Sequence, residues 1–86
     1  MTNEEMNELG ISPSAYRFES HPSIRVEWRG PASWAIVDYG IVLNKDNQWE
    51  HEPSPSNRSD DFIERTRYPL NEALRRALKA IEENNT

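Results

Sequence analysis

The chain of 86 residues has no cysteine, only three glycines and no long hydrophobic run. The absence of cysteine excludes disulfides, thiolate metal ligands and a cysteine nucleophile. With so few glycines, the sequence also has no glycine-rich loop of the kind that cradles phosphates. The opening stretch MTNEEMNELG is acidic and carries no apolar run, so we expect neither a secretion signal nor a membrane span there. These features favour a cytoplasmic location.

Hydrophobic residues are also scarce, at 35% of the chain, but three tryptophans compensate in part. A large aromatic ring buries roughly 150–250 Å² when it enters a core. We therefore predict a single folded domain, residues 1–86, in which residues 1–22 form a loosely packed N-terminal segment. Within that segment, residues 3–10 have the pattern of a short helix, with Asn3 as N-cap and Gly10 after the last turn.

Apolar and polar residues alternate in the middle of the chain, which predicts strands. In residues 23–29, Ile24, Val26 and Trp28 alternate with charged residues, and this is the period of a half-buried strand. Residues 33–39, SWAIVDY, are almost continuously apolar, which indicates a central strand covered on both faces. The other segments predicted to be extended are residues 15–19, 41–44 and 48–52.

Residues 70–83 give the clearest pattern, because their apolar residues recur at helical spacing. Pro69 suits the start of such a helix. The apolar stripe consists of Leu70, Ala73, Leu74, Ala77, Leu78 and Ile81. Two hairpins followed by one amphipathic helix predict an α+β fold: a small antiparallel sheet of three or four strands with the C-terminal helix packed on one face.

Trp28 and Trp34 stand in core-facing strand positions, and we predict that both are buried. Trp49 is different, because it belongs to a segment with no aliphatic residue. It either caps the open end of the sheet or is exposed as an anchor for a partner. Tryptophan and arginine are the side chains most enriched in the hot spots of protein interfaces.

The run Glu50-His51-Glu52 does not predict a metal site. On a strand, His51 points away from both glutamates, so the three side chains cannot converge on one ion. No metal-ligand spacing such as HExxH occurs, and we predict neither a metal nor a cofactor. Asp60 and Asp61 are interpreted as residues at the start of a helix rather than as paired catalytic carboxylates. The sequence contains no recognisable catalytic set, and we predict that the protein is not an enzyme.

Charge is distributed unevenly along the chain, whose net charge is −5. Between residues 46 and 64, six acidic residues stand against Arg58 alone, and between residues 65 and 79, five basic residues stand against Glu72 alone. The acidic stretch and its tryptophan are the predicted contact surface for a partner. The residues proposed for it are Trp49, Glu50, Glu52, Arg58, Asp60 and Asp61.

Residues 34–78 resemble small uncharacterised proteins of actinobacteria and their phages. The shared pattern is LN-x4-W-x2-EP-x-PS-x-R, followed by an arginine–aromatic step and a helix that begins L-x-EA. The matching positions here are Leu43, Asn44, Trp49, Glu52, Pro53, Pro55, Ser56, Arg58, Arg67, Tyr68, Leu70, Glu72 and Ala73. The resemblance implies a phage or prophage context and carries no known chemistry.

The leading hypothesis is a non-enzymatic protein-binding module. It is a small phage or mobile-element protein that docks on a larger host protein through its acidic surface and modulates it, in host takeover or against host defence. One alternative is contact with nucleic acid through the basic residues from Arg65 to Lys79, although the negative net charge makes nucleic acid the less favoured partner. A second alternative is a structural or assembly role as a homo-oligomer. No membrane partner is expected.

Overall fold

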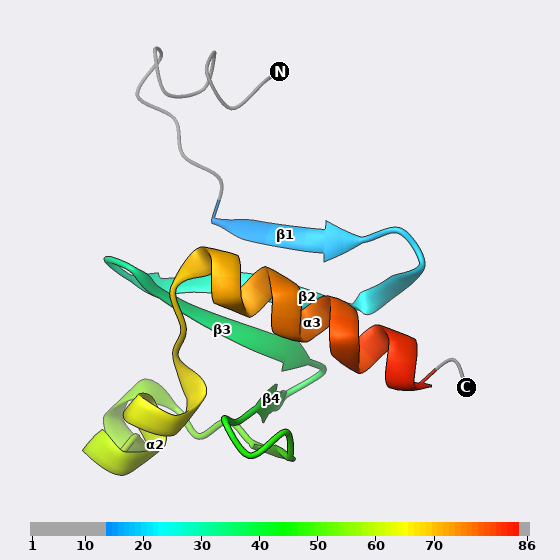
Figure 1. Ribbon diagram of the computed structural model, residues 1–86. Coiled ribbons are helices and arrows are strands. Elements are labelled where there is room, and N and C mark those ends of the chain that lie inside the picture. Colours follow the sequence, from blue (N-terminus) through cyan, green and yellow to red (C-terminus); the bar gives the residue numbers. More distant parts are fainter. Residues whose placement is uncertain (1–13, 85–86) are drawn as a thin grey trace, which may run out of the picture.

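The computed structural model describes residues 14–84 and has the predicted α+β class, with one more strand than expected. Five antiparallel strands follow one another across the sheet in chain order (Figure 1). The strands are β1 (Ala15–Phe18), β2 (His21–Gly30), β3 (Ser33–Asp38), β4 (Ile41–Leu43) and β5 (Trp49–His51), and they are followed by the 3-10 helix η1 (Pro55–Asn57) and the helices α2 (Asp60–Thr66) and α3 (Leu70–Asn84). The extra strand is β1, which pairs along β2. The helix predicted for residues 3–10 lies outside the described residues.

Strand β3 is the middle strand and is buried on both faces, as its continuous apolar pattern predicted. Trp34 and Ile36 point towards α3 and join the larger core. Ala35 and Val37 point to the opposite face, where Phe62 of α2 covers them together with a residue of β4. Each helix therefore packs against one face of the same strand.

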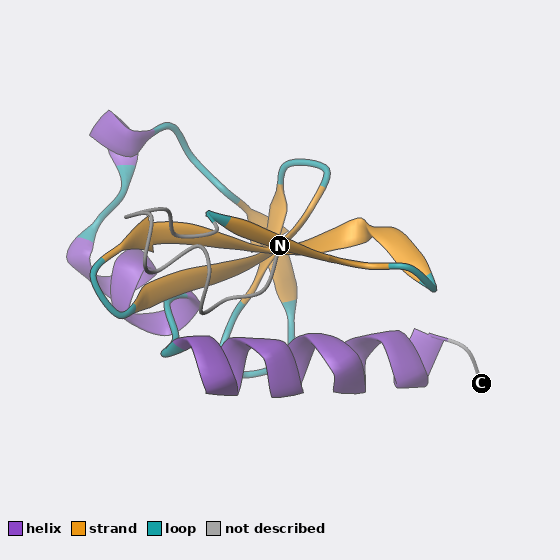
Figure 2. Ribbon diagram, turned by 90° about the horizontal axis from the view of Figure 1, so that it is seen from above, coloured by secondary structure: helices purple, strands orange, loops and turns teal. Residues whose placement is uncertain are grey.

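Helix α3 lies along one face of the sheet, as Figure 2 shows. Its buried contact line consists of Ala73, Ala77 and Ile81, which are four residues apart and lie on one side of the helix. The two alanines allow the helix backbone to approach the sheet closely. Leu78 is 49% exposed, so the buried stripe is narrower than the sequence pattern predicted.

The two tryptophans predicted for the core have different surroundings. Trp28 and Trp34 lie directly opposite each other across β2 and β3. Trp34 is 8% exposed, because the ring of Tyr16 lies 5.6 Å away and its backbone is bridged to that of Tyr68. Trp28, near the end of β2, is 50% exposed, so the prediction that it is buried was wrong. The alternation correctly placed Trp28 on the sheet face that α3 covers. It did not show that this covering ends before the end of β2.

A tight two-residue turn joins β3 to β4. Tyr39 and Gly40 have φ angles of 43° and 85°, which are the left-handed values of a type I′ hairpin turn. Glycine adopts such an angle without steric cost, whereas tyrosine does so at some cost. Tyr39 is 83% exposed at the tip of this turn. Its ring therefore lies outside the core.

Candidate contact site at the turn of residues 44–48

The turn between β4 and β5 is organised by the side chain of Asn44, which is buried. Its Oδ1 atom accepts hydrogen bonds from the backbone amides of Asp46 (2.9 Å) and Gln48 (3.0 Å). Asn47 adopts the left-handed conformation, with a φ angle of 62°, which asparagine tolerates better than most residues. An asparagine at each of these positions thus defines a turn whose other side chains are exposed.

Helices α2 and α3 both form hydrogen bonds with this turn. The Lys45 amide donates to the Arg65 carbonyl at 2.9 Å, and the Lys45 ammonium donates to the carbonyl of Glu64 in α2. From α3, Arg76 donates to the Lys45 carbonyl at 3.5 Å and to Asn47 Oδ1 at 3.4 Å. We call residues 44–48 the clamped turn. The polar residues 45–47 predict a turn here, but the sequence does not show what holds it, since its partners in α2 and α3 lie far along the chain.

Tyr68 connects the core of the protein to the start of the clamped turn. Its hydroxyl donates to the carbonyl of Leu43 at 3.0 Å, just before the turn begins. Burial raises the pKa of Tyr68 to about 12, so this hydroxyl keeps its proton at physiological pH. The guanidinium of Arg76 lies over the Tyr68 ring, 5.0 Å from its centroid. Core and turn are therefore joined by one aromatic side chain.

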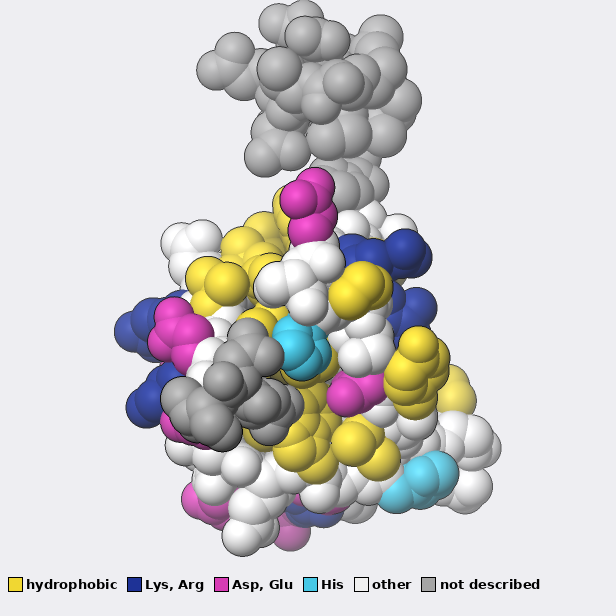
Figure 3. Space-filling model, turned by 90° about the vertical axis from the view of Figure 1, so that its right-hand side faces the viewer, with side chains coloured by type: hydrophobic (Ala, Val, Ile, Leu, Met, Phe, Trp, Pro, Cys, Tyr) yellow, Lys and Arg dark blue, Asp and Glu magenta, His cyan; other side chains and the backbone are white. Residues whose placement is uncertain are grey.

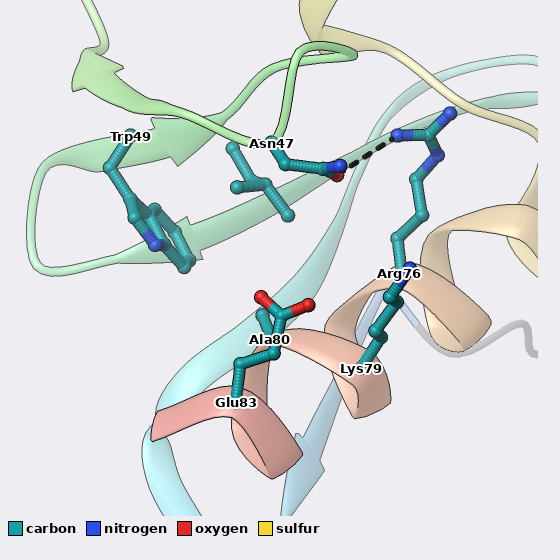
Figure 4. Close-up of a pocket in the computed structure, with 7 residues that line it drawn as sticks. Asn47, Trp49, Arg76, Lys79, Ala80 and Glu83 are labelled. Carbon is teal, nitrogen blue, oxygen red and sulfur yellow. Dashed lines mark hydrogen bonds between the residues drawn. The ribbon is translucent and has the colours of Figure 1, made fainter. Parts of the chain in front are cut away.

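Trp49 follows the clamped turn, and its exposure lies between the two placements that the sequence left open. It is half-buried and packs against the core beneath α3. It also lines a small hollow, about 40 Å³ in volume, between β5 and α3. Figure 4 shows Trp49 on one side of this hollow, with Ala80 and Glu83 of α3 on the other. Next to it lies an open hollow of about 290 Å³, lined by Asn47, Arg75, Arg76 and Lys79.

Glu50 points to the opposite face of the sheet and is used within the molecule. Arg65 donates two hydrogen bonds to its carboxylate, at 2.9 and 2.7 Å, and the Asn44 amide donates a third at 2.9 Å. The bonds from Arg65, followed by that from Asn44, lower the pKa of Glu50 to about 2. This acidic side chain therefore fastens β5 to α2.

Glu52 is surrounded by three arginines, and we call these four residues the Glu52 cluster. Arg29 donates to its carboxylate at 3.2 and 2.9 Å, and Arg67 donates at 3.2 Å. Arg58 pairs with it at 3.6 Å and also donates to the Pro53 carbonyl at 2.9 Å. Burial alone would raise the pKa of Glu52, but the hydrogen bonds and charge of Arg29, and then the charges of Arg58 and Arg67, outweigh it and lower the pKa.

Asp60 and Asp61 are exposed in the first turn of α2, as predicted. The N-cap is Ser59, whose hydroxyl accepts from the amide of Phe62 at 3.1 Å. Asp61 contributes to an open hollow of about 460 Å³ beside the clamped turn. Its full lining is Lys45, Asp46, Asp61, Glu64 and Arg65.

The six predicted contact residues consequently occupy different places. Trp49 lies on the α3 side of the sheet, Glu50 lies on the α2 side, and Glu52 and Arg58 are joined in the Glu52 cluster. Only Asp60 and Asp61 keep exposed carboxylates among the acidic members.

The basic residues from Arg65 to Lys79 do not form one face either. Arg65 binds Glu50, and Arg67 belongs to the Glu52 cluster. Arg75, Arg76 and Lys79 lie together on α3, where the first two also pair with Glu72.

Within residues 14–84, no group of three or more histidine, cysteine, aspartate or glutamate side chains is arranged to hold a metal ion. Neither described helix is both long and apolar enough to span a membrane. No protein-family model, curated protein or solved structure matches the chain.

Proposed function

We propose that the protein is a non-enzymatic binding module that docks on a larger protein through the clamped turn and the hollows on its two sides. The observation that carries the proposal is an exposed turn tied by hydrogen bonds to both helices. Exposed loops held by a rigid scaffold are common binding elements. A loop that is already ordered loses little conformational freedom on binding, which favours affinity.

The two sides of the turn carry different charges. On the α2 side, Asp46, Asp61 and Glu64 line the open hollow together with two cations. On the α3 side, Arg75, Arg76 and Lys79 line the other one. A partner with a basic segment next to an acidic one would match both sides, and this pattern fixes its orientation.

Trp49 is the proposed anchor on the α3 side. Its ring reaches the hollow between β5 and α3, so an apolar side chain of the partner can pack against it. The predicted acidic surface is thus narrowed to the hollow on the α2 side, since Glu50 and Glu52 are held by arginines.

The partner we propose is a host protein, such as an enzyme or a defence factor, whose working surface the module covers. This part of the proposal rests on the resemblance of residues 34–78 to small proteins of actinobacteria and their phages. Occlusion requires only a docked protein and no chemistry of its own.

The test begins with capture of host proteins on the tagged wild-type protein, followed by calorimetry with each purified candidate. The decisive variants are Asp46→Arg and Lys79→Glu, one on each side of the clamped turn. Both positions are exposed, so folding should be preserved. We expect each reversal to weaken binding by tenfold or more, because like charges would then face each other across the interface.

Glu82→Arg is the matched control, because Glu82 is exposed on α3 and lines none of the three hollows beside the clamped turn. It should bind like the wild type. Equal affinity of Asp46→Arg, Lys79→Glu and the wild type for every captured protein would rule out the clamped turn as the docking surface.

A further inference from the structure

A second group of arginines lies on the sheet face opposite α3, away from the clamped turn. Arg17 of β1 and Arg25 of β2 are directly opposite each other in the strand register. Their neighbours along β1, Tyr16 and Phe18, pack towards the core beneath α3, so the two arginines point to the other face. Like charges placed opposite each other on neighbouring strands repel and destabilise the pairing.

Carboxylates compensate this repulsion only in part. Arg25 pairs with Glu27 at 3.2 Å, but Glu27 also binds Arg29 at 3.1 Å. The side chain of Arg17 is exposed and makes no hydrogen bond or ion pair with any residue between 14 and 84. The Arg17–Arg25 pair therefore keeps a local excess of positive charge on a protein whose net charge is −5.

The Arg17–Arg25 pair borders an open hollow of about 250 Å³, which is also lined by Pro22, Ser23 and Tyr39. The aromatic ring is that of Tyr39, in the tight turn between β3 and β4, and this residue is 83% exposed. Two guanidinium groups, a hydroxyl and an exposed ring thus meet at one end of the sheet. Figure 3 shows this end of the molecule, with Lys and Arg side chains both on the α3 side and on the opposite side of the sheet.

We propose that this hollow binds a nucleotide unit, with the phosphate on the Arg17–Arg25 pair and the base stacked on Tyr39. Arginine is suited to a phosphate because its planar fork donates two parallel hydrogen bonds to the oxygens. The Ser23 hydroxyl supplies a further donor on the wall of the hollow. Base stacking on an exposed aromatic ring beside cationic side chains is the usual mode of binding single strands.

The same chemistry recognises a free mononucleotide and a nucleotide within a single strand. This site shares no residue with the clamped turn, so it stands whether or not the docking proposal holds.

The experiment measures the affinities of three probes at several salt concentrations: inorganic phosphate, thymidine monophosphate and a short oligothymidylate. We expect all three to bind the wild-type protein. If thymidine monophosphate binds more tightly than the oligothymidylate, the ligand is a free mononucleotide; if the oligothymidylate binds more tightly, it is a single strand. For the oligonucleotide, each arginine that neutralises a phosphate contributes about 0.7 to the slope of log affinity against log salt. Arg17→Gln and Arg25→Gln should each lower the slope by about that amount, and Arg17→Lys should retain it.

The Tyr39→Ser variant tests the contact with the base separately from the contact with the phosphate. It should weaken both thymidine probes roughly tenfold, since the stacking contact is lost, and leave inorganic phosphate unchanged. Asn71→Glu is the matched control, because it makes the same change of net charge at an exposed position on α3 that lines none of the hollows, and it should leave every probe unaffected.

Circular dichroism confirms that each variant is folded before its affinity is compared. Three results would overturn the proposal: no binding of any probe, an unchanged salt slope in both arginine variants, or equal binding of the thymidine probes by Tyr39→Ser and the wild type.

Discussion

The Glu52 cluster and the Arg17–Arg25 pair contain the same kind of residue on the same face of one sheet, yet they differ in what surrounds it. In the cluster, the carboxylate of Glu52, the residue after β5, lies among the guanidinium groups of Arg29 in β2, Arg58 after η1 and Arg67 after α2. At the pair, the strand register places one guanidinium opposite another. The placement of a carboxylate by the fold, rather than residue type, therefore decides whether an arginine is held by ion pairs within the molecule or, like Arg17, has an exposed side chain without one among residues 14–84.

The Glu52 cluster and the Arg17–Arg25 pair also differ in how far their side chains are exposed to solvent. The side chains of the Glu52 cluster are only 7–20% exposed, whereas Arg17 is open to solvent. Burial lowers the pKa of Arg67, and the neighbouring charges of Arg29 and Arg58 lower it further, while Glu52 opposes them. One carboxylate thus holds three arginines in place, and the cluster depends on it.

The largest effect is expected from Glu52→Gln, which keeps the shape of the side chain and removes its charge. Three partly buried arginines would lose their common counter-ion. Removal of one partner from a buried ion pair costs about 3–5 kcal/mol, and we expect about 3 kcal/mol here because the cluster keeps some contact with water. Urea denaturation at neutral pH measures the change in the free energy of unfolding.

Glu27→Gln is the control for that measurement. Glu27 pairs with Arg25 and Arg29 but is more exposed than Glu52, so we expect a loss of about 1 kcal/mol or less. Equal losses in the two variants would show that the Glu52 cluster is an ordinary surface network and would remove the contrast with the Arg17–Arg25 pair.

The contrast also marks the limit of what the sequence could predict. Periodicity identified the doubly covered strand β3 and the helix at residues 70–83, because each pattern is local and complete within one segment. The Glu52 cluster joins residues that are 23 and 15 positions apart, and its formation depends on the strand order and on where α2 ends. The exposure of Trp28 was missed for the same reason, since cover by another element is not encoded in the strand's own alternation.

A smaller effect on stability is expected from lowering the pH, which protonates Glu50 of β5 and weakens its ion pair with Arg65 of α2. The folded-state pKa of Glu50 is about 2, against an ordinary value of 4.5, so its carboxylate stabilises the fold above pH 4.5. This contribution should disappear as the pH falls from 4.5 towards 2, and Glu50→Gln should lack it throughout. Urea midpoints of the two proteins, compared between pH 7 and pH 2, should therefore converge in acid. A constant difference over this range would show that the charge of Glu50 contributes nothing.

The smallest change in the free energy of unfolding is expected from Arg17→Gln. Because the Arg17 side chain has no ion-pair or hydrogen-bond partner among residues 14–84, its replacement breaks no described ion pair and relieves the repulsion with Arg25. We expect the free energy of unfolding to stay within about 0.5 kcal/mol of the wild type, or to rise slightly. A loss greater than 1 kcal/mol in urea denaturation would mean that Arg17 holds the fold together, as the arginines of the Glu52 cluster do. A stable Arg17→Gln protein with weakened phosphate binding would instead show that this arginine is kept for a ligand.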